Sequence, residues 1–427
     1  MATTAHHPAS VPERLIVSAI HATWVLWLLG ALYAVGPLLG WLLGGIAALG
    51  AYGGRAAFRP HPVLLLWGGA MLAMLPVLWI GHANFDLGAA KTLKSTVGWA
   101  KGWALLALFP LAAASLPVRE APVVRALNRV ALHTLLLLPI LLAAPMLGLP
   151  GTLWVSPLKV IGGSGPEYFS ATIYSIDPGS GRPRWQFFAP WSPAAGMVGV
   201  MLALLALRDP SRGWRVIGVA GGVAMALLSQ SRLALAALLF LGPMAVFVRH
   251  VAAPRTWFLI AGAVLLAGFA ALPILDGAAQ LVGDLQAARA DSTRVRSALG
   301  RIAIDRWQAE AFWFGHGIVE NGPHYVEYMP IGSHHSWYGL LFVKGLVGAV
   351  LLALPLAATL VILFARASGG GETRAALAVA VLLLLYSFGE NLEVLGYLVW
   401  PGLVLLGVAL RRPPRGATPP RTGGARR

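Results

Sequence analysis

Long apolar stretches recur along the whole chain and leave little sequence for anything except the connections between them. A helix that crosses a bilayer needs about 20 mainly apolar residues. Stretches of this kind lie near residues 15–34, 36–53, 63–81, 96–116, 130–149, 191–207, 216–230, 233–248, 256–275, 337–365, 375–389 and 395–410. We therefore expect an all-α polytopic integral membrane protein with about twelve transmembrane helices.

The composition agrees with this class and excludes several kinds of chemistry. Hydrophobic residues make up 58% of the chain and charged residues only 11%, whereas a soluble domain carries about 25% charged residues. The chain has no cysteine, which excludes disulfides, thiolate metal sites and cysteine nucleophiles. Residues 1–14 are polar and lead directly into the first apolar stretch, so no cleavable signal peptide is expected.

Short arginine-rich connections predict the orientation of the chain. Basic residues are enriched in loops on the cytoplasmic side of a membrane. With both termini in the cytoplasm, every short basic connection falls on the cytoplasmic side. The arginines of these connections are Arg55, Arg59, Arg119, Arg125, Arg129, Arg208, Arg212, Arg215, Arg249, Arg255, Arg366 and Arg374. The net charge of +16 then reflects topology and contact with membrane lipids, and no nucleic-acid partner is expected.

The predicted outer side carries three longer connections, near 82–95, 150–190 and 276–336. The second is rich in Gly, Pro and Ser and is expected to be mostly irregular. The third begins with a helix near 283–312, expected to lie over the membrane mouth. Its Val295, Leu299 and Ile302 share one helical face.

The domain organisation follows from these segments. Residues 1–275 hold nine transmembrane helices and the loop at about 150–190; residues 276–336 form a large periplasmic loop with short helices; residues 337–410 hold three more helices; residues 411–427 form a basic cytoplasmic tail. No cytoplasmic connection has room for a soluble catalytic domain. The phosphate-loop and His-Glu-x-x-His patterns are both missing, so we expect neither a nucleotide nor any other cofactor.

Two arginines on the predicted outer side are candidates for binding an anion. Arg232 stands in a tight turn between apolar helices, where a charge is costly unless it is paired or functional. It could form a salt bridge to Glu390 or Glu393, or bind a ligand. Arg184 directly precedes a predicted span and is either an exposed loop residue or a phosphate ligand. The guanidinium fork suits phosphate because it donates two parallel hydrogen bonds.

Two adjacent histidines are the candidates for a general base. His334 and His335 follow a polar turn and open a long apolar helix. The positive end of the helix dipole lowers an imidazole pKa and favours the neutral, proton-accepting form. Adjacent side chains on a helix point in different directions and no third ligand has the usual spacing, so no metal site is expected. Glu390 could pair with the arginines, hold an imidazole nitrogen, or be a solvated helix end.

Arginines and a neutral imidazole at an outer membrane face suit one reaction type. A hydroxyl attacks the anomeric carbon of a sugar that is linked to a lipid diphosphate. The diphosphate leaves as a stable anion, so a general acid is unnecessary, and arginines stabilise its developing charge. The histidine removes the proton of the attacking hydroxyl. Neither a nucleotide nor a metal is required.

The same residues resemble the bacterial O-antigen ligase and polymerase superfamily. Its hallmark is His-Asn-x9-Gly-x-x-Gly at the end of a large periplasmic loop. Here His334 and His335 are followed by nine residues and then by Gly345-Leu346-Val347-Gly348. The resemblance extends to Arg184, to the Ser-x-Ser-Arg run ending in Arg232, and to Arg301, Trp307 and Phe314-Gly315-His316-Gly317. The usual Asn-Pro-Asn-like turn is replaced by Ala189-Pro190-Trp191-Ser192.

This resemblance implies a metal-independent, inverting glycosyltransferase in the bacterial inner membrane, with its active site facing the periplasm. The donor would be a glycan linked to undecaprenyl diphosphate. The acceptor would be the lipid A core for a ligase, which we favour slightly, or a growing glycan for a repeat-unit polymerase. His334 or His335 would be catalytic. Arg184, Arg232 and Arg301 would bind the diphosphate, and Trp307, Tyr338 and Glu390 would support the site.

Two other functional classes stay open from the sequence. A transporter of lipid-linked sugars or anions predicts charged residues deep inside several helices and often inverted repeats. Only Lys101 and Lys344 lie well inside predicted helices, and no repeat is visible. A surface-binding or assembly protein predicts that both histidines can be replaced without loss of function.

Overall fold

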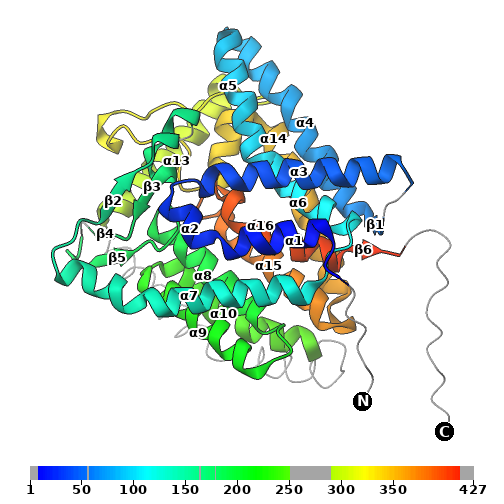
Figure 1. Cartoon of the computed structure of the whole chain (residues 1–427). Coiled ribbons are helices and arrows are strands. Elements are labelled where there is room, and N and C mark those ends of the chain that lie inside the picture. The colour runs from blue at the N-terminus through cyan, green and yellow to red at the C-terminus, as the bar shows by residue number, and fades with distance from the viewer. Residues whose placement is uncertain (1–7, 55–56, 163–164, 178, 251–289, 414–427) are drawn as a thin grey trace, which may run out of the picture.

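The computed structural model describes residues 8–54, 57–162, 165–177, 179–250 and 290–413, and its elements form a helical bundle (Figure 1). The prediction of an all-α membrane protein is confirmed at this level. Over the described ranges, seven helices are long and apolar enough to cross a membrane: Leu32–Tyr52, Pro62–Asn84, Gly88–Ser115, Glu120–Met146, Arg232–His250, Ser336–Ala365 and Leu392–Ala409. The predicted number of about twelve is not confirmed, and the predicted span at 256–275 lies outside the described residues.

Between residues 8 and 146, the described part of the chain forms the helices α1 (Val11–His21), α2 (Thr23–Leu28), α3 (Leu32–Tyr52), α4 (Pro62–Asn84), α5 (Gly88–Lys101), α6 (Trp103–Ser115) and α7 (Glu120–Met146). The prediction of a long connection at 82–95 is wrong, because α5 begins at Gly88 and occupies most of this range. Side chains of α5 bind it to α4: the Thr92 hydroxyl bonds Nδ1 of His82, and the Trp99 indole donates to the Met71 carbonyl.

From residue 192 onward, the described residues contain α8 (Ser192–Ala206), α9 (Arg212–Leu228), α10 (Arg232–His250), α13 (Ala290–Glu310), α14 (Ser336–Ala365), α15 (Gly371–Ser387) and α16 (Leu392–Ala409). The described part of the predicted helix at 283–312 is confirmed as α13. Its stripe is confirmed too, because Val295 and Leu299 are buried and pack with Ile302 in one small cluster.

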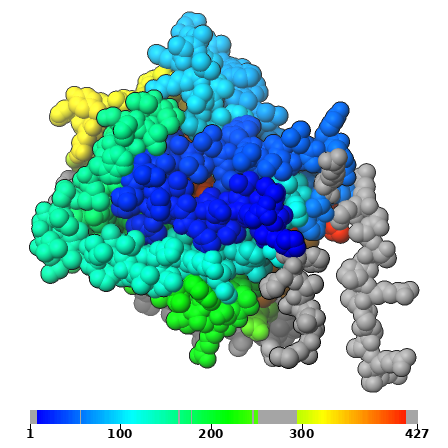
Figure 2. Space-filling view, in the orientation of Figure 1, coloured from blue at the N-terminus to red at the C-terminus, as the bar shows by residue number. Residues whose placement is uncertain are grey.

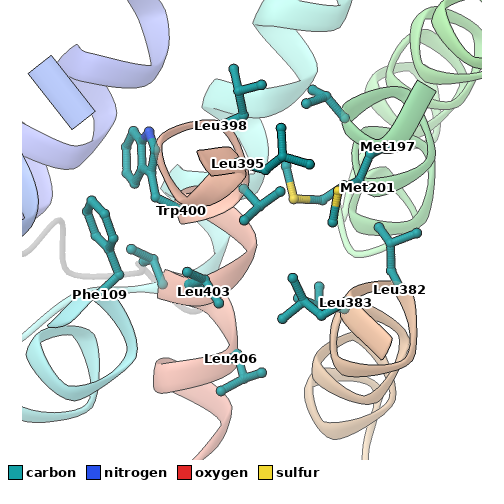
Figure 3. Packing of buried hydrophobic residues seen from close by; sticks show 14 of the residues in the cluster. Phe109, Met197, Met201, Leu382, Leu383, Leu395, Leu398, Trp400, Leu403 and Leu406 are labelled. Carbon is teal, nitrogen blue, oxygen red and sulfur yellow. The ribbon is translucent and has the colours of Figure 1, made fainter. Parts of the chain in front are cut away.

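Helix α16 is the centre of the bundle, and most of its side chains are buried. Figure 3 shows its leucines packed between α6, α8 and α15, with Trp400 beside Phe109 of α6. The rings of these two residues stack with centroids 5.2 Å apart. On the face shown in Figure 2, the blue N-terminal helices lie across the middle of the molecule. The large apolar core fixes the ends of α15 and α16, which carry part of the candidate site.

The predicted cytoplasmic connections meet at one end of the bundle. The Ser10 hydroxyl donates to the Pro117 carbonyl, the Arg119 guanidinium pairs with Glu13 at 2.6 Å, and Arg208 pairs with Glu120 at 2.7 Å. These contacts place the connections on one side of the molecule, as the predicted topology requires. Which side faces the cytoplasm stays a prediction.

The chain after α16 joins the same end. Strand β1 (Arg59–Pro60) pairs with strand β6 (Arg411–Arg412), and the Arg411 guanidinium donates to the Val118 carbonyl at 2.8 Å. The first two residues of the predicted tail are therefore a strand rather than a free segment. Residues 414–427 of that tail lie outside the described part of the chain.

A buried ion pair at this end gives a test of the packing. The Asp209 side chain is fully enclosed and accepts two hydrogen bonds from Arg125, each 2.7 Å long, and one from Asn128. Asp209→Asn should lower the free energy of unfolding by about 2 kcal/mol, because the half-buried guanidinium loses its anion. Thermal unfolding in detergent measures this, with the exposed Asp86→Asn as the control. Equal midpoints for the two variants would contradict the pairing.

The 150–190 connection is more ordered than predicted. It contains two antiparallel hairpins, β2 (Thr152–Val155) with β3 (Ser170–Thr172), and β4 (Tyr174–Ile176) with β5 (Pro183–Trp185). Figure 1 shows these strands together on the left of the molecule. Pairing of β5 with β4 fixes the position of Arg184 in the strand, opposite Ser175.

Helix α14 is discontinuous, whereas the sequence predicts one helix over 337–365. Gly345 adopts φ +64° and breaks the helix. Residues 312–317 cross this break, and their backbone groups form hydrogen bonds with the α14 amides and carbonyls that lose their helical partners there. The His316 and Gly317 amides donate to the Phe342 and Val343 carbonyls, at 2.8 and 2.9 Å. On the other side of the break, the amides of Leu346 and Val347 donate to the Phe312 and Trp313 carbonyls, at 2.9 and 3.2 Å.

Candidate functional site

The imidazole of His335 caps helix α14. Its Nδ1 accepts a hydrogen bond from the Tyr338 amide at 3.3 Å, and its own amide donates to the Asn391 side-chain oxygen at 2.9 Å. The ring also stacks on Tyr338, with centroids 3.8 Å apart. A cap of this kind satisfies an amide that the helix leaves without a partner. Because Nδ1 is the acceptor, a neutral His335 carries its proton on Nε2, and it has no ring nitrogen left to act as a base.

His334 has a different environment. Its backbone lies in the left-handed region at φ +60°, a conformation that costs a non-glycine residue about 1 kcal/mol or more. Over the described ranges, no hydrogen bond holds its half-buried ring. Burial, and secondarily the charge of Arg296, lowers the pKa of His334 to about 4. The imidazole is therefore neutral at pH 7, and both charge state and access suit a proton acceptor.

Glu390 lies between α15 and α16 and is only 2% exposed. The interpretation of this residue as a solvated helix end is therefore wrong. The Trp191 indole donates to its carboxylate at 3.0 Å. Burial raises the pKa of Glu390 to about 7, and the nearby guanidinium groups of Arg296 and Arg184 act in the opposite direction. This carboxylate therefore lies near two guanidinium groups that come from separate parts of the chain.

Hydrogen bonds through Ser336 join the start of α14 to the turn before α16. The Ser336 hydroxyl donates to the Glu390 carbonyl at 2.7 Å and accepts from the Leu392 amide at 2.9 Å. The histidine pair and Glu390 are distant in sequence. The hydrogen bonds of Ser336 and Asn391 hold these two parts of the chain next to each other.

Arg184 is held by its own hairpin. Its guanidinium lies 3.4 Å from the carboxylate of the buried Asp177, and its carbonyl accepts from the Ser192 hydroxyl at 3.4 Å. The second contact connects β5 to the first residue of α8. Arg184 therefore lies at the start of α8, beside the Trp191 that binds Glu390.

The turn that carries Arg232 is connected to the same strand. The Gln230 side chain donates to the Pro183 carbonyl at 2.9 Å. Ser231 caps α10, because its hydroxyl accepts from the Ala234 amide at 3.3 Å, while the Ser229 hydroxyl accepts from the Ser231 amide. The two serines are thus structural. Arg232 is the first, exposed residue of α10, at a helix N-terminus that favours anions.

Helix α13 adds an arginine that the predicted site did not contain. Gly300 lies against the Tyr338 ring, and a Cβ added there would lie 2.7 Å from Tyr338 Cε2. Arg296 lies one turn earlier on the same helical face, and its charge acts on both His334 and Glu390. Arg301 points about 100° away from Gly300 and is exposed. No contact within the described ranges joins it to His334 or Glu390.

Two other residues from the predicted motif have structural positions. The Trp307 indole donates to the Phe312 carbonyl at 2.7 Å, and its ring stacks on Phe312. His316 is buried, with Nδ1 3.0 Å from the Phe342 carbonyl and Nε2 2.8 Å from Glu310. Both residues hold the segment that crosses the α14 break. Tyr338, by contrast, supports the site directly because His335 stacks on its ring.

Sequence reasoning missed Trp191, Asn391 and the particular position of Arg296. Trp191 had a signal, since it stands where the resembling family has an Asn-Pro-Asn-like turn. Asn391 lies next to Glu390, but nothing in the sequence indicates its bond to His335. No group of three or more potential metal ligands occurs within the described ranges.

The capping role of His335 gives a direct stability test. Asparagine can accept the same amide hydrogen bond but loses the ring stack, so we expect His335→Asn to unfold between wild type and His335→Ala. His335→Ala should lose about 1–2 kcal/mol, because both the cap and the ring stack disappear. Thermal unfolding in detergent distinguishes the two variants. If both unfold alike, the cap does not contribute.

Comparison with protein-family models gives no match for this chain, and comparison with curated proteins gives none either. The resemblance to the O-antigen ligase and polymerase superfamily therefore rests on the motif residues and their spacing alone.

Proposed function

We propose that the protein is a membrane glycosyltransferase that moves a glycan from a lipid-linked diphosphate donor to an acceptor hydroxyl. One observation carries this proposal. The neutral imidazole of His334 lies near the guanidinium group of Arg296, which also acts on Glu390 together with Arg184. A proton acceptor and anion-binding groups in one small region are what a displacement at an anomeric carbon requires.

In the proposed reaction, a bond forms between the acceptor oxygen and the anomeric carbon of the glycan. The bond from that carbon to the diphosphate oxygen breaks, and its electron pair leaves with the lipid diphosphate. The acceptor proton passes to His334. Arg184, Arg232 and Arg296 stabilise the charge on the leaving group. Attack opposite the leaving group inverts the configuration at the anomeric carbon.

The motif resemblance supports undecaprenyl diphosphate as the donor lipid and the periplasmic side of the inner membrane as the site of reaction. It also supports ligation to a lipid A core, with polymerisation of repeat units as the second possibility. Both reactions use the same base and the same arginines, and they differ in the acceptor. The product tells them apart: a ligase yields capped lipopolysaccharide, and a polymerase yields a ladder of chain lengths.

A transporter is the competing class, and the discontinuous helix α14 favours it, because broken helices line binding sites in many transporters. In this chain, however, residues 312–317 fill the break and satisfy its backbone groups on both sides. In the described part of the chain, the break is therefore occupied by the protein's own residues 312–317 and leaves no backbone groups there for a transported ligand. This is the reason why we propose transfer chemistry rather than transport.

Alanine variants of the arginines test the proposed anion site in a strain that lacks the protein. We expect Arg184→Ala, Arg232→Ala and Arg296→Ala each to lower transfer by about 10²–10³-fold, since each removes a donor aimed at the leaving group. Lipid-linked glycan should accumulate, which extraction and gel analysis of the polysaccharide would show. Arg182→Ala is the matched control, because this exposed arginine lies two residues before Arg184.

The comparison of Arg296→Ala with Arg301→Ala decides between two assignments of the third arginine. The contacts favour Arg296, and the motif resemblance favours Arg301. If Arg301→Ala loses transfer and Arg296→Ala does not, the resemblance is the better guide. Normal surface polysaccharide in all the arginine variants at equal expression would overturn the proposed function.

A further inference from the structure

The segment between α13 and the histidine pair forms a small projecting hairpin, here called the finger (residues 321–330). An antiparallel bridge joins Asn321 to Pro330, and the Gly322 amide donates to the Met329 carbonyl at 2.8 Å. The yellow segment beside α13 in Figures 1 and 2 projects from the body of the molecule. The finger is thus an ordered element with its own hydrogen bonds, rather than an irregular link.

Val326 anchors the finger to α13. Its side chain is fully buried and packs with Val295 and Leu299. Val295 directly precedes Arg296 in α13, so the anchor lies on the same turn of the helix as the arginine whose charge acts on His334. At the base of the finger, the Ile331 amide donates to the Glu320 carbonyl at 2.8 Å, and the chain reaches His334 three residues later. The finger is therefore fixed next to the candidate site.

Aromatic side chains surround this anchor and face outward. Tyr325 is 57% exposed and Tyr328 is 61% exposed. Over the described ranges, neither hydroxyl has a hydrogen-bond partner. Glu327 and Tyr328 both have left-handed backbones, at φ +57° and +54°. The His324 ring meets the Tyr328 ring edge-on at 5.7 Å. Consecutive left-handed non-glycine residues are unfavourable, and such conformations gather at binding sites.

The charge of the finger indicates what it binds. No lysine or arginine occurs between Arg306 and Lys344, so the segment lacks the basic residues that bind anionic lipid headgroups. Tyrosines offer large, rigid faces at a small entropic cost, together with a hydroxyl. Such faces fit the C–H surfaces of sugar rings, while Asn321, His324 and Glu327 can bond to sugar hydroxyls. The chemistry suits a carbohydrate better than a membrane surface.

We propose that the finger is a glycan-binding element, in which Tyr325 and Tyr328 stack on sugar rings next to the reacting end of the chain. This proposal rests on the proposed function, because a transferase of lipid-linked glycans must hold sugar residues near its general base, His334. The binding itself can be measured without any transfer reaction.

The experiment uses the full-length protein in detergent. The probe is the water-soluble polysaccharide released by mild acid from the surface of cells that contain the protein, and calorimetry measures its binding. We expect Tyr325→Ala and Tyr328→Ala each to weaken binding about fivefold to tenfold, and the double variant to weaken it further. The corresponding phenylalanine variants should stay within about threefold of wild type, because stacking is retained. Tyr52→Ala, at a 96% exposed tyrosine at the end of α3, is the matched control.

Each outcome has a defined meaning. Lack of binding by the wild type, or equal binding by wild type and alanine variants, overturns the proposal. A change of oligomeric state without a change of glycan binding also overturns it, because the finger is then a contact between copies.

A parallel transfer assay separates this proposal from the proposed function. If His334→Ala loses transfer while the tyrosine variants bind normally, the finger proposal fails and the function stands. If the tyrosine variants lose binding while His334→Ala retains transfer, the finger stands and the function fails.

Discussion

His334→Ala should lower the rate of glycan transfer by about 10²–10⁴-fold, the usual contribution of a positioned general base. The expectation rests on a difference between two neighbouring imidazoles. Nδ1 of His335 is occupied as the cap of α14, whereas the ring of His334 is held by no hydrogen bond within the described ranges. Transfer can be followed as the loss of lipid-linked donor in membranes that contain equal amounts of each variant.

The matched control is His335→Asn, which keeps the cap and should keep most of the activity. His334→Asn is a second test of the base, because asparagine tolerates the left-handed backbone better than alanine does. If both His334 variants work normally and His335→Asn is inactive, the roles of the two histidines are reversed.

The pH dependence of transfer gives an independent check on the base. The base must be unprotonated, and the lowered pKa of His334 keeps it so until the pH falls to about 4. Activity should therefore stay level from pH 8 to about 5 and be half lost near pH 4. An unperturbed histidine would lose half its activity near pH 6.5.

Two other groups near the site titrate in the accessible range, and variants separate them from His334. The pKa of His335 is also lowered to about 4, by burial, so the measurement is repeated in His335→Asn. Glu390, with a pKa of about 7, could add an inflection near neutrality, which Glu390→Gln removes. An acid limb near 6.5 that survives both substitutions would contradict the environment assigned to His334.

The sequence predicted the membrane class, the positions of most described helices and the stripe on α13. All of these follow from local apolar periodicity, which a single sequence displays directly. It did not predict α5, which is held to α4 by side-chain contacts of Thr92 and Trp99. Nor did it predict the hairpins at 150–190, because glycine and proline in that segment are compatible both with irregular loops and with tight turns.

For the candidate site, residue types were easier to predict than partners. In the structure the charge of Arg296 acts on both His334 and Glu390, and that of Arg184 acts on Glu390. That these residues form one catalytic site stays a prediction. Contacts between residues far apart in sequence could not be predicted. Ser336 and Asn391 gain their roles only because the start of α14 packs against the turn before α16. The choice between Arg296 and Arg301 depended on which face of α13 meets Tyr338, and Gly300 marks that face.

The glycines of the histidine motif show why a pattern can be informative for more than one reason. In the sequence, Gly345 and Gly348 belong to the motif on which the resemblance to a catalytic family rests. In the structure Gly345 is the residue that breaks α14, and Gly315 approaches it closely from the crossing segment, with φ +67°. The motif thus describes a backbone crossing that holds the start of α14, and with it the histidines.

Gly345→Ala should lower the free energy of unfolding by about 3 kcal/mol or more. An alanine at φ +64° is strained, and its Cβ would overlap the Trp313 carbonyl group, so residues 312–317 must shift. Gly69→Ala is the control, because this glycine lies inside α4 with nothing within 4 Å of an added Cβ, and alanine is the better helix former. Thermal unfolding in detergent should show a much lower midpoint for Gly345→Ala alone. Because the crossing positions the start of α14, transfer should also fall in the folded fraction of this variant. Equal midpoints for the two alanine variants would mean that the chain does not cross itself at Gly345.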